Sequence, residues 1–257
     1  MLSAEQLDDY HRNGFLIPNF RFPMTVIEEI RAAHTRFVEK FPEFIDYCPA
    51  LLDHDLSFLN YARFPDVLDM VAQILGDDIS LWNSSLFAKP ARKGRKTPWH
   101  QDGEYWPIRP LATCTVWIAL DDSTVDNGCL RVIPGSHADQ RLARHQTNDS
   151  PDLTLNQELQ SDEFDASQAV DLQMEAGQIS LHDVFLAHGS EANRSARPRR
   201  GMTLRYMPTT SLYDRAAELE IAVRLDAGGP RERSIFLVRG VDRHGGSDFA
   251  LRGGNLI

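Results

Sequence analysis

The sequence predicts a mainly β protein with helices at its N-terminus, whose strands form a double-stranded β-helix, the cupin-like jelly roll. Two observations support this fold class. Helical periodicity dominates residues 1–76, whereas residues 77–240 contain many short β-like segments separated by Gly and Pro turns. A chain of 257 residues that is 42% hydrophobic and 25% charged has the composition of an ordinary globular domain. We therefore expect a single domain over residues 1–257.

The helices are predicted from local signals. A capping box at residues 3–6 predicts a helix over 3–13, and an apolar stripe predicts a second helix over 23–40. A third helix is expected over 65–75, because a proline opens it and a glycine follows it. The apolar run 15–18 ends in proline and is typical of an edge strand.

The core of the jelly roll is predicted to hold the remaining strands. They are expected over residues 79–90, 112–120, 129–133, 170–174, 178–182, 200–208, 217–225 and 234–239. The segment 217–225 could instead begin as a helix. In 79–90, Asn83, Ser85 and Phe87 share one face and Trp82 lies on the other, so the polar face suits a ligand cavity.

Charge and cysteine content exclude several classes of protein. A net charge of −10 argues against nucleic-acid binding, which needs an excess of basic residues. Three scattered cysteines predict neither a disulfide framework nor a zinc site. There is no signal-like N-terminal segment and no apolar run long enough for a membrane span. We expect a cytoplasmic protein that acts on a small molecule, without membrane contact.

A candidate metal site lies in the extended segment around residue 100. Side chains two residues apart point to the same face of a strand, so His100 and Asp102 can bind one ion together. A second histidine would complete the facial triad of a non-haem Fe(II) oxygenase. Sequence alone leaves four histidines open for this role: His137, His182, His188 and His244.

A run of motifs over residues 80–208 resembles a known family. The motifs are His100-Gln101-Asp102, Asn127-Gly128-Cys129-Leu130, Pro134-Gly135-Ser136-His137, and His188-Gly189-Ser190 followed by Asn193, Ser195 and Arg199. This run closely resembles the phytanoyl-CoA dioxygenase family of Fe(II)- and 2-oxoglutarate-dependent oxygenases. The resemblance implies that His100, Asp102 and His188 bind Fe(II), with 2-oxoglutarate and O2 as cosubstrates.

The same resemblance implies a site for the cosubstrate. Arg199 is expected to bind the distal carboxylate of 2-oxoglutarate, with Arg200 as the substitute if the strand register slips by one residue. Trp117 is expected beside the cosubstrate, and Asn83 is expected to face the cosubstrate or the substrate. Relatives often have a hydroxyl or amide side chain two residues after this arginine, which Gly201 cannot supply.

Four residues are candidates for the substrate side: Tyr105, Trp106, Arg205 and His182. Arg205 has the same strand parity as Arg199, so it should also point inward. His182 can equally be a hydrogen-bonded core histidine.

The substrate is expected to be small and polar, with a negative group. Besides Arg205, this expectation rests on Arg109, on the basic loop 89–96, and on the long acidic segment 138–168, which is predicted to cover the site. The alternative is that these charges belong to an ordinary solvated surface.

The leading hypothesis is a dioxygenase that hydroxylates a small polar metabolite and releases succinate and CO2. The carboxylate of Asp102 favours hydroxylation, because related halogenases have a small residue there. Two alternatives stay open: an acyl-CoA 2-hydroxylase of the same family, and a non-catalytic jelly-roll binding protein with a vestigial metal site. A Gly-x-Ser-x-Gly hydrolase motif is absent from the sequence.

Overall fold

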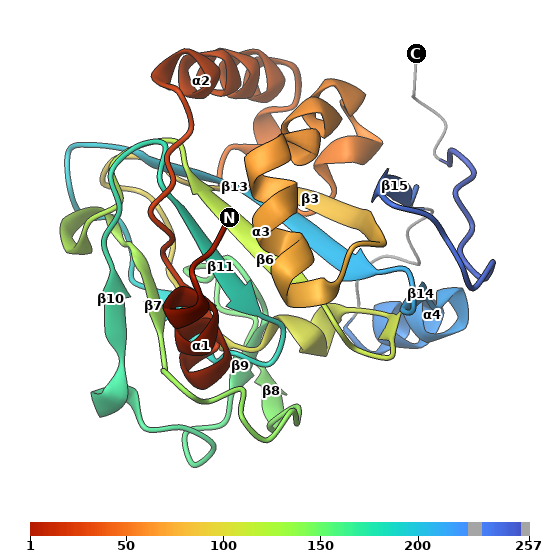
Figure 1. The fold of residues 1–257 in the computed structure, drawn as a ribbon. Helices are drawn as coiled ribbons and strands as arrows, with labels where there is room; N and C mark the ends of the chain where they lie inside the picture. Colours follow the sequence, from red (N-terminus) through yellow and green to blue (C-terminus); the bar gives the residue numbers. More distant parts are fainter. Residues whose placement is uncertain (226–232, 253–257) are drawn as a thin grey trace.

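Two antiparallel sheets dominate this computed structural model, which describes residues 1–225 and 233–252 (Figure 1). The major sheet has the order β1-β11-β6-β13-β3-β15, with β2 also paired to β3. Its strands are β1 (Phe15–Leu16), β2 (Tyr47–Cys48), β3 (Ile79–Lys89), β6 (Cys114–Ala119), β11 (Ile179–Asp183), β13 (Arg199–Pro208) and β15 (Phe236–Arg239). The predicted jelly-roll fold class is confirmed.

The minor sheet has the order β10-β7-β12-β4. Its strands are β4 (Thr97–His100), β7 (Leu130–Val132), β10 (Val170–Leu172) and β12 (His188–Ser190). Two small pairs complete the strands: β5 (Ile108–Arg109) with β14 (Leu212–Tyr213), and β8 (His145–Thr147) with β9 (Gln157–Leu159). Side chains from both large sheets line one cavity, so the sheets face each other across it.

The N-terminal helices begin and end where local signals predict. They are α1 (Ala4–Asn13), α2 (Met24–Lys40) and α3 (Pro65–Leu75). Ser3 and Gln6 form the predicted capping box of α1, and Gly14 ends that helix with a φ of 80°. Short 3-10 helices connect the elements: η1 (Pro42–Phe44), η2 (Leu51–Asp53), η3 (Leu56–Arg63), η4 (Asp102–Tyr105), η5 (Val125–Asn127) and η6 (Ala166–Gln168).

The main hydrophobic core lies between these helices and the outer face of the major sheet. Strand β6 shows how alternation divides the two faces: Val116 and Ile118 pack into this core, while Trp117 lines the cavity on the opposite face, where Thr115 Oγ1 lies 3.5 Å from Asp102 Oδ2. The helices contribute Ile27, Ile30, Val67 and Val71 to the core. The major sheet is therefore apolar outside and mixed inside, and the mixed face carries the candidate site.

Two predictions about elements were wrong. A bulge in β3 leaves Trp82 without a partner on β13, because Asn83 pairs with Arg205 and Leu81 with Tyr206. Trp82 therefore points into the same cavity as Asn83, not to the opposite face. The segment predicted as a strand over 217–225 is helix α4 (Arg215–Arg224), which Asp214 caps and which is rich in helix-forming Ala and Glu.

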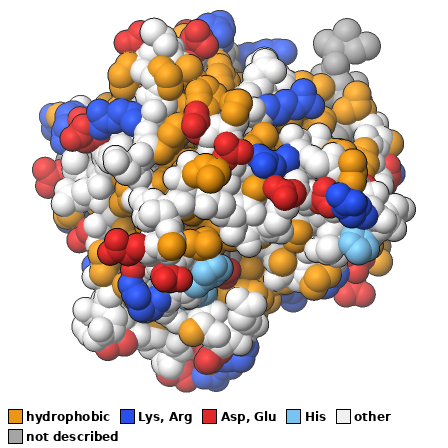
Figure 2. Space-filling model, viewed as in Figure 1, with side chains coloured by type: hydrophobic (Ala, Val, Ile, Leu, Met, Phe, Trp, Pro, Cys, Tyr) orange, Lys and Arg blue, Asp and Glu red, His pale blue; other side chains and the backbone are white. Residues whose placement is uncertain are grey.

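The surface seen in Figure 2 carries acidic and basic side chains close together, with hydrophobic side chains between them. No helix among residues 1–225 and 233–252 is long and apolar enough to cross a bilayer.

We predict that acid destabilises the protein through His34, which is buried in α2. Burial and the nearby Arg200 lower the pKa of His34 from 6.5 to about 4. Between these values the unfolded chain binds the proton and the folded chain does not, so stability falls as pH falls. The loss from this one group should be about 2 kcal/mol between pH 7 and pH 5. Urea denaturation of the wild type and His34→Leu at both pH values checks this; equal pH dependence in the two proteins would contradict it.

Candidate metal centre and active site

Three buried side chains form the candidate metal centre. His100 ends β4, Asp102 opens η4, and His188 opens β12 directly opposite His100 in the sheet. One ligand atom from each lies within 4.8 Å of the others. Strand pairing thus brings together residues that are far apart in the sequence.

The donor atoms have the geometry that a metal requires. The Nδ1 atoms of His100 and His188 lie 2.9 Å from the carbonyls of Pro98 and Leu186. A proton on each Nδ1 leaves the Nε2 lone pairs free. These two Nε2 atoms lie 3.7 and 3.9 Å from the Asp102 Oδ1 atom. The three residues therefore fit one divalent ion.

The electrostatics of the site favour the metal-binding protonation states. Burial opposes the charge of Asp102, but contacts with His100 and His182 outweigh it and hold the pKa of Asp102 well below its usual range. Burial and the neighbouring His100 hold the pKa of His188 well below its ordinary value. A carboxylate and neutral imidazoles are the forms that bind metals.

The structure separates His188 from the other candidate histidines. His182 lies on β11 with its Nε2 3.6 Å from Asp102 Oδ2, on the other carboxylate oxygen. The Nε2 of His137 bonds to the His11 carbonyl at 3.0 Å, which suits a structural role. His244 is exposed. His188 is thus the histidine that the structure groups with His100 and Asp102.

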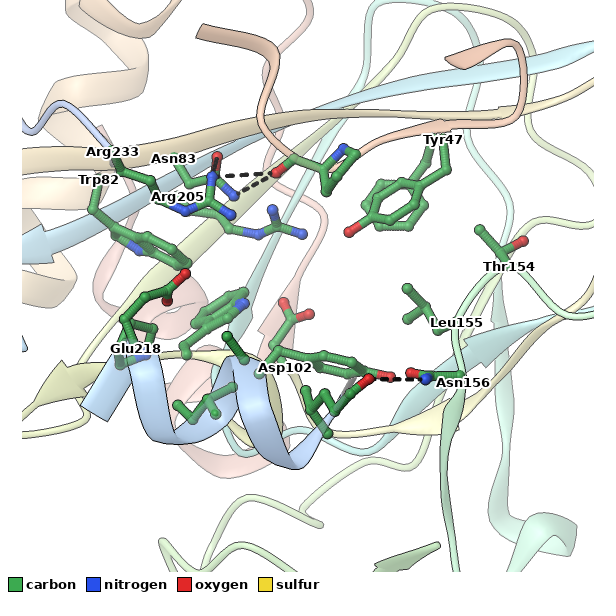
Figure 3. Close-up of a pocket in the computed structure, with 18 residues that line it drawn as sticks. Tyr47, Trp82, Asn83, Asp102, Thr154, Leu155, Asn156, Arg205, Glu218 and Arg233 are labelled. Atoms are coloured by element: carbon green, nitrogen blue, oxygen red, sulfur yellow. Dashed lines mark hydrogen bonds between the residues drawn. The ribbon is translucent and has the colours of Figure 1, made fainter. Parts of the chain in front are cut away.

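Two cavities meet at the metal centre, and Phe87, Asp102 and Arg205 line both. The inner cavity is also lined by Thr97, His100, Trp117, Leu130, His182, His188, Ser190, Arg199 and Thr203. The outer cavity, of about 330 Å³, is drawn in Figure 3. Its other lining residues are Tyr47, Pro49, Trp82, Asn83, Tyr105, Trp106, Pro107, Thr154, Leu155, Asn156, Glu218, Ile221, Ala222, Leu225 and Arg233.

Arg199 is a buried cation in the inner cavity. Its Nε bonds to the Gly128 carbonyl at 3.2 Å, and its guanidinium lies 5.4 Å from the centroid of Trp117. No carboxylate among the residues described is within ion-pair distance of it, and burial lowers the pKa of Arg199 to about 10. The next residue, Arg200, instead forms a bidentate pair with Asp121. The predicted strand register is therefore correct, and Arg199 is free to bind an anion.

Gly201 allows Trp117 to lie against β13. A Cβ atom on Gly201 would come within 2.2 Å of the Trp117 ring. We predict that Gly201→Ala displaces this ring and weakens anion binding in the inner cavity, whereas the same change in a Trp117→Phe background has a smaller effect. Calorimetric titration with 2-oxoglutarate measures both. Additive effects of the two substitutions would contradict the prediction.

Several expectations about substrate residues need correction. Asn83 lies in the outer cavity, not beside Arg199. Arg109 is exposed and bonds to backbone carbonyls, so it does not line the cavities. The basic loop 89–96 connects β3 of the major sheet to β4 of the minor sheet; Arg95 in it pairs with Asp46 and Lys96 with Glu191, so these two cations are already paired, whereas Lys89 is buried.

The predicted substrate residues Tyr105, Trp106 and Arg205 do line the outer cavity. Sequence reasoning missed Arg233, whose Nη1 donates to Asn83 Oδ1 at 2.8 Å. It also missed the apolar side of α4. No sequence motif marks Arg233 or α4 as part of the cavity, because both reach it through contacts between distant segments.

The family model described as Phytanoyl-CoA dioxygenase (PhyH) matches residues 10–201. A phytanoyl-CoA dioxygenase domain-containing protein 1 homolog from Dictyostelium discoideum is 34% identical over 110 residues, which are 42% of this chain and 39% of that protein. A probable phytanoyl-CoA dioxygenase from Caenorhabditis elegans is 28% identical over 240 residues, 80% of this chain and 75% of the relative. Apart from this nematode protein, the chain spans less than half the length of the first curated relatives that it matches.

Several solved structures have the same fold as this chain. The non-heme monooxygenase ThoJ, in its apo form, is 26% identical with a TM-score of 0.72, and the match covers 91% of this chain and 84% of ThoJ. The ThoJ-nickel complex is 25% identical, with a TM-score of 0.68 and coverage of 95% and 87%. EvdO2 from Micromonospora carbonacea var. aurantiaca, solved with 2-oxoglutarate, shares the fold at 21% identity, with a TM-score of 0.67 and coverage of 81% and 91%. Since the family model also matches most of the chain, this protein belongs to the phytanoyl-CoA dioxygenase family.

Proposed function

We propose that this protein is an Fe(II)- and 2-oxoglutarate-dependent dioxygenase that hydroxylates a small polar metabolite and releases succinate and CO2. One observation carries the proposal: the buried group of His100, Asp102 and His188 lies where two cavities meet, a larger outer one and an inner one whose Arg199 has no ion-pair partner among the described residues. Two histidines and one carboxylate leave coordination positions open on Fe(II).

The chain's own residues have distinct roles in this reaction. Fe(II), 2-oxoglutarate and O2, when bound, supply the oxidation of a C–H bond. His100 and His188 present their Nε2 lone pairs, because the neighbouring carbonyls hold their Nδ1 protons. Arg199 binds the distal carboxylate of 2-oxoglutarate and Trp117 flanks it. Burial of all these groups excludes water from the reacting centre.

The size and lining of the outer cavity support a small substrate. Its volume of about 330 Å³ is at the lower end of ligand pockets, and Asn83, Arg205 and Arg233 give it polar groups. The acyl-CoA alternative rests on the names of the relatives. A long isoprenoid chain would need an extended apolar groove, which this lining does not provide.

The segment 138–168 is proposed to cover the substrate. It contains the hairpin of β8 and β9, and Thr154, Leu155 and Asn156 between these strands line the outer cavity. We expect limited proteolysis to cut within 138–168 and the bound ligands to protect it. Digestion with the Glu-specific endoproteinase Glu-C, for which Glu158 and Glu163 are sites, with and without Fe(II), 2-oxoglutarate and a turned-over substrate, followed by mass spectrometry, measures this. Equal cleavage in both states would reject the cover.

Succinate formation tests the function directly. The purified protein is incubated with Fe(II), 2-oxoglutarate and a panel that contains small polar metabolites and long-chain acyl-CoA thioesters. Iron-dependent succinate formation that a small polar compound stimulates is expected. No iron-dependent consumption of 2-oxoglutarate would favour the vestigial binding protein. Strong turnover of a long-chain thioester would replace the small substrate with the acyl-CoA alternative.

A further inference from the structure

Arg205 is a buried cation at the wall that the two cavities share. Its Nη1 donates to the Ser85 hydroxyl at 2.5 Å, and its Nε is buried without a hydrogen-bond partner among the residues described. Within the same residues, no carboxylate lies within ion-pair distance of it. Burying an unpaired charge is costly, so a site of this kind is built for an incoming anion.

Aromatic rings hold the guanidinium in place. Its Cζ lies 5.0 Å from the centroid of Trp106 and 5.9 Å from that of Phe87. These contacts stabilise the cation through the faces of the rings and leave its in-plane N–H donors for a ligand. Figure 3 shows the side chain extending from β13 into the cavity, above Asp102.

The carboxylate of Asp102 does not satisfy Arg205. Asp102 attracts it at longer range, but both carboxylate oxygens of Asp102 face histidines, at 3.7 Å for His100 and 3.6 Å for His182. In the proposed function, the bound metal ion neutralises the negative charge of Asp102. Arg205 would then need a second anion, and Arg199 already accounts for the distal carboxylate of the cosubstrate.

The outer cavity has a polar side and an apolar side. Arg205, Arg233 and Asn83 lie together on one side in Figure 3. Helix α4 supplies Ile221 and Ala222 to the other, together with the buried Glu218. Aromatic side chains complete the walls: Tyr47, Trp82, Phe87, Tyr105 and Trp106. A ligand that fills this cavity therefore has a charged end and an apolar body.

We propose that the substrate is a small carboxylic acid with a flat apolar body, and that Arg205 binds its carboxylate. The inference rests on the proposed function, since it names the substrate class of the same site. A carboxylate matches the planar fork of a guanidinium. The aromatic walls and α4 contact the body and present a C–H bond of it to the metal centre.

The test compares acids with their neutral primary amides. Benzoate, 3-phenylpropanoate and indole-3-acetate, each with its amide, are titrated by calorimetry into the protein loaded with Fe(II) and 2-oxoglutarate without oxygen. We expect at least one acid to bind roughly 10- to 100-fold more tightly than its amide. In Arg205→Gln this preference should disappear, while the affinity for 2-oxoglutarate changes little.

Arg109→Gln is the matched control, because Arg109 is an exposed arginine outside both cavities; it should retain the preference for acids. Arg205→Lys keeps the charge without the fork and should retain part of the preference. If Arg205→Gln does not fold, which thermal unfolding would show, Arg205→Lys takes its place as the test variant.

Three results would overturn the proposal: no acid saturates the wild type, acids and amides bind equally, or Arg205→Gln weakens 2-oxoglutarate instead of the acids. Failure of the proposed function is seen separately, as absence of iron-dependent 2-oxoglutarate binding in the wild type. In that case, the affinities for the acids and the amides are compared in the metal-free protein.

Discussion

Replacing His188 by alanine is expected to remove iron binding and reduce substrate turnover to background. His188 supplies one of three donors, and β12 places its Nε2 next to Asp102 by direct pairing with β4. Loss of one of the three protein donors weakens iron binding, and the catalytic group acts as a unit, so the loss of turnover should be roughly 1000-fold or more. Metal analysis after dialysis and succinate formation measure the two effects.

His244→Ala is the matched control, because His244 is an exposed histidine outside the site. It should bind iron and turn over as the wild type does. A His188→Ala protein that retains stoichiometric iron and full turnover would show that another histidine is the third ligand. His182, on the far oxygen of Asp102, would be the first to test.

Arg199→Ala is expected to weaken 2-oxoglutarate binding by roughly 30- to 1000-fold, which corresponds to about 2 to 4 kcal/mol for a charged bidentate contact. Arg199 is buried in the inner cavity, and its hydrogen bonds within the described residues go to backbone carbonyls, so its charge is available to a ligand. The apparent affinity is measured by titration of 2-oxoglutarate in the iron-loaded protein without oxygen.

Arg200→Ala separates this effect from general loss of charge. Arg200 is the adjacent residue, and it pairs with Asp121 instead of lining a cavity. Its removal should lower stability and leave 2-oxoglutarate affinity nearly unchanged. Arg205→Ala should also affect the cosubstrate less than Arg199→Ala does. The reverse ranking would place the cosubstrate carboxylate at Arg205.

Local chemistry in the sequence determined the three N-terminal helices and the faces of β6 and β13. The capping box before α1 and the proline at the start of α3 act within a few residues, so they can be recognised without the fold. Alternation in β6 and β13 likewise decides which side chains point inward, because the period of a strand is two. The family resemblance assigns Arg199 and Trp117 to the cosubstrate site, and alternation agrees with it, since both side chains line the inner cavity.

The metal ligands were predictable for a different reason. The pair of His100 and Asp102 is a local pattern, but four histidines competed for the third position. The motif that resembles a family selected His188, and the structure then placed it opposite His100. Periodicity could not have made that choice, since strand partners distant in sequence are set by the packing of the sheets.

The tertiary structure alone decided the shape of the outer cavity. The bulge that turns Trp82 inward is set by the pairing of β3 with β13, and alternation within β3 predicts the opposite face. Arg233 reaches Asn83 across 150 residues, and α4 closes the cavity from a segment first assigned to a strand. Such contacts depend on long-range packing, for which the local sequence has no pattern. The sequence by itself therefore determined the metal-binding triad, with the help of the family motif, and the fold decided the shape and lining of the cavity beside it.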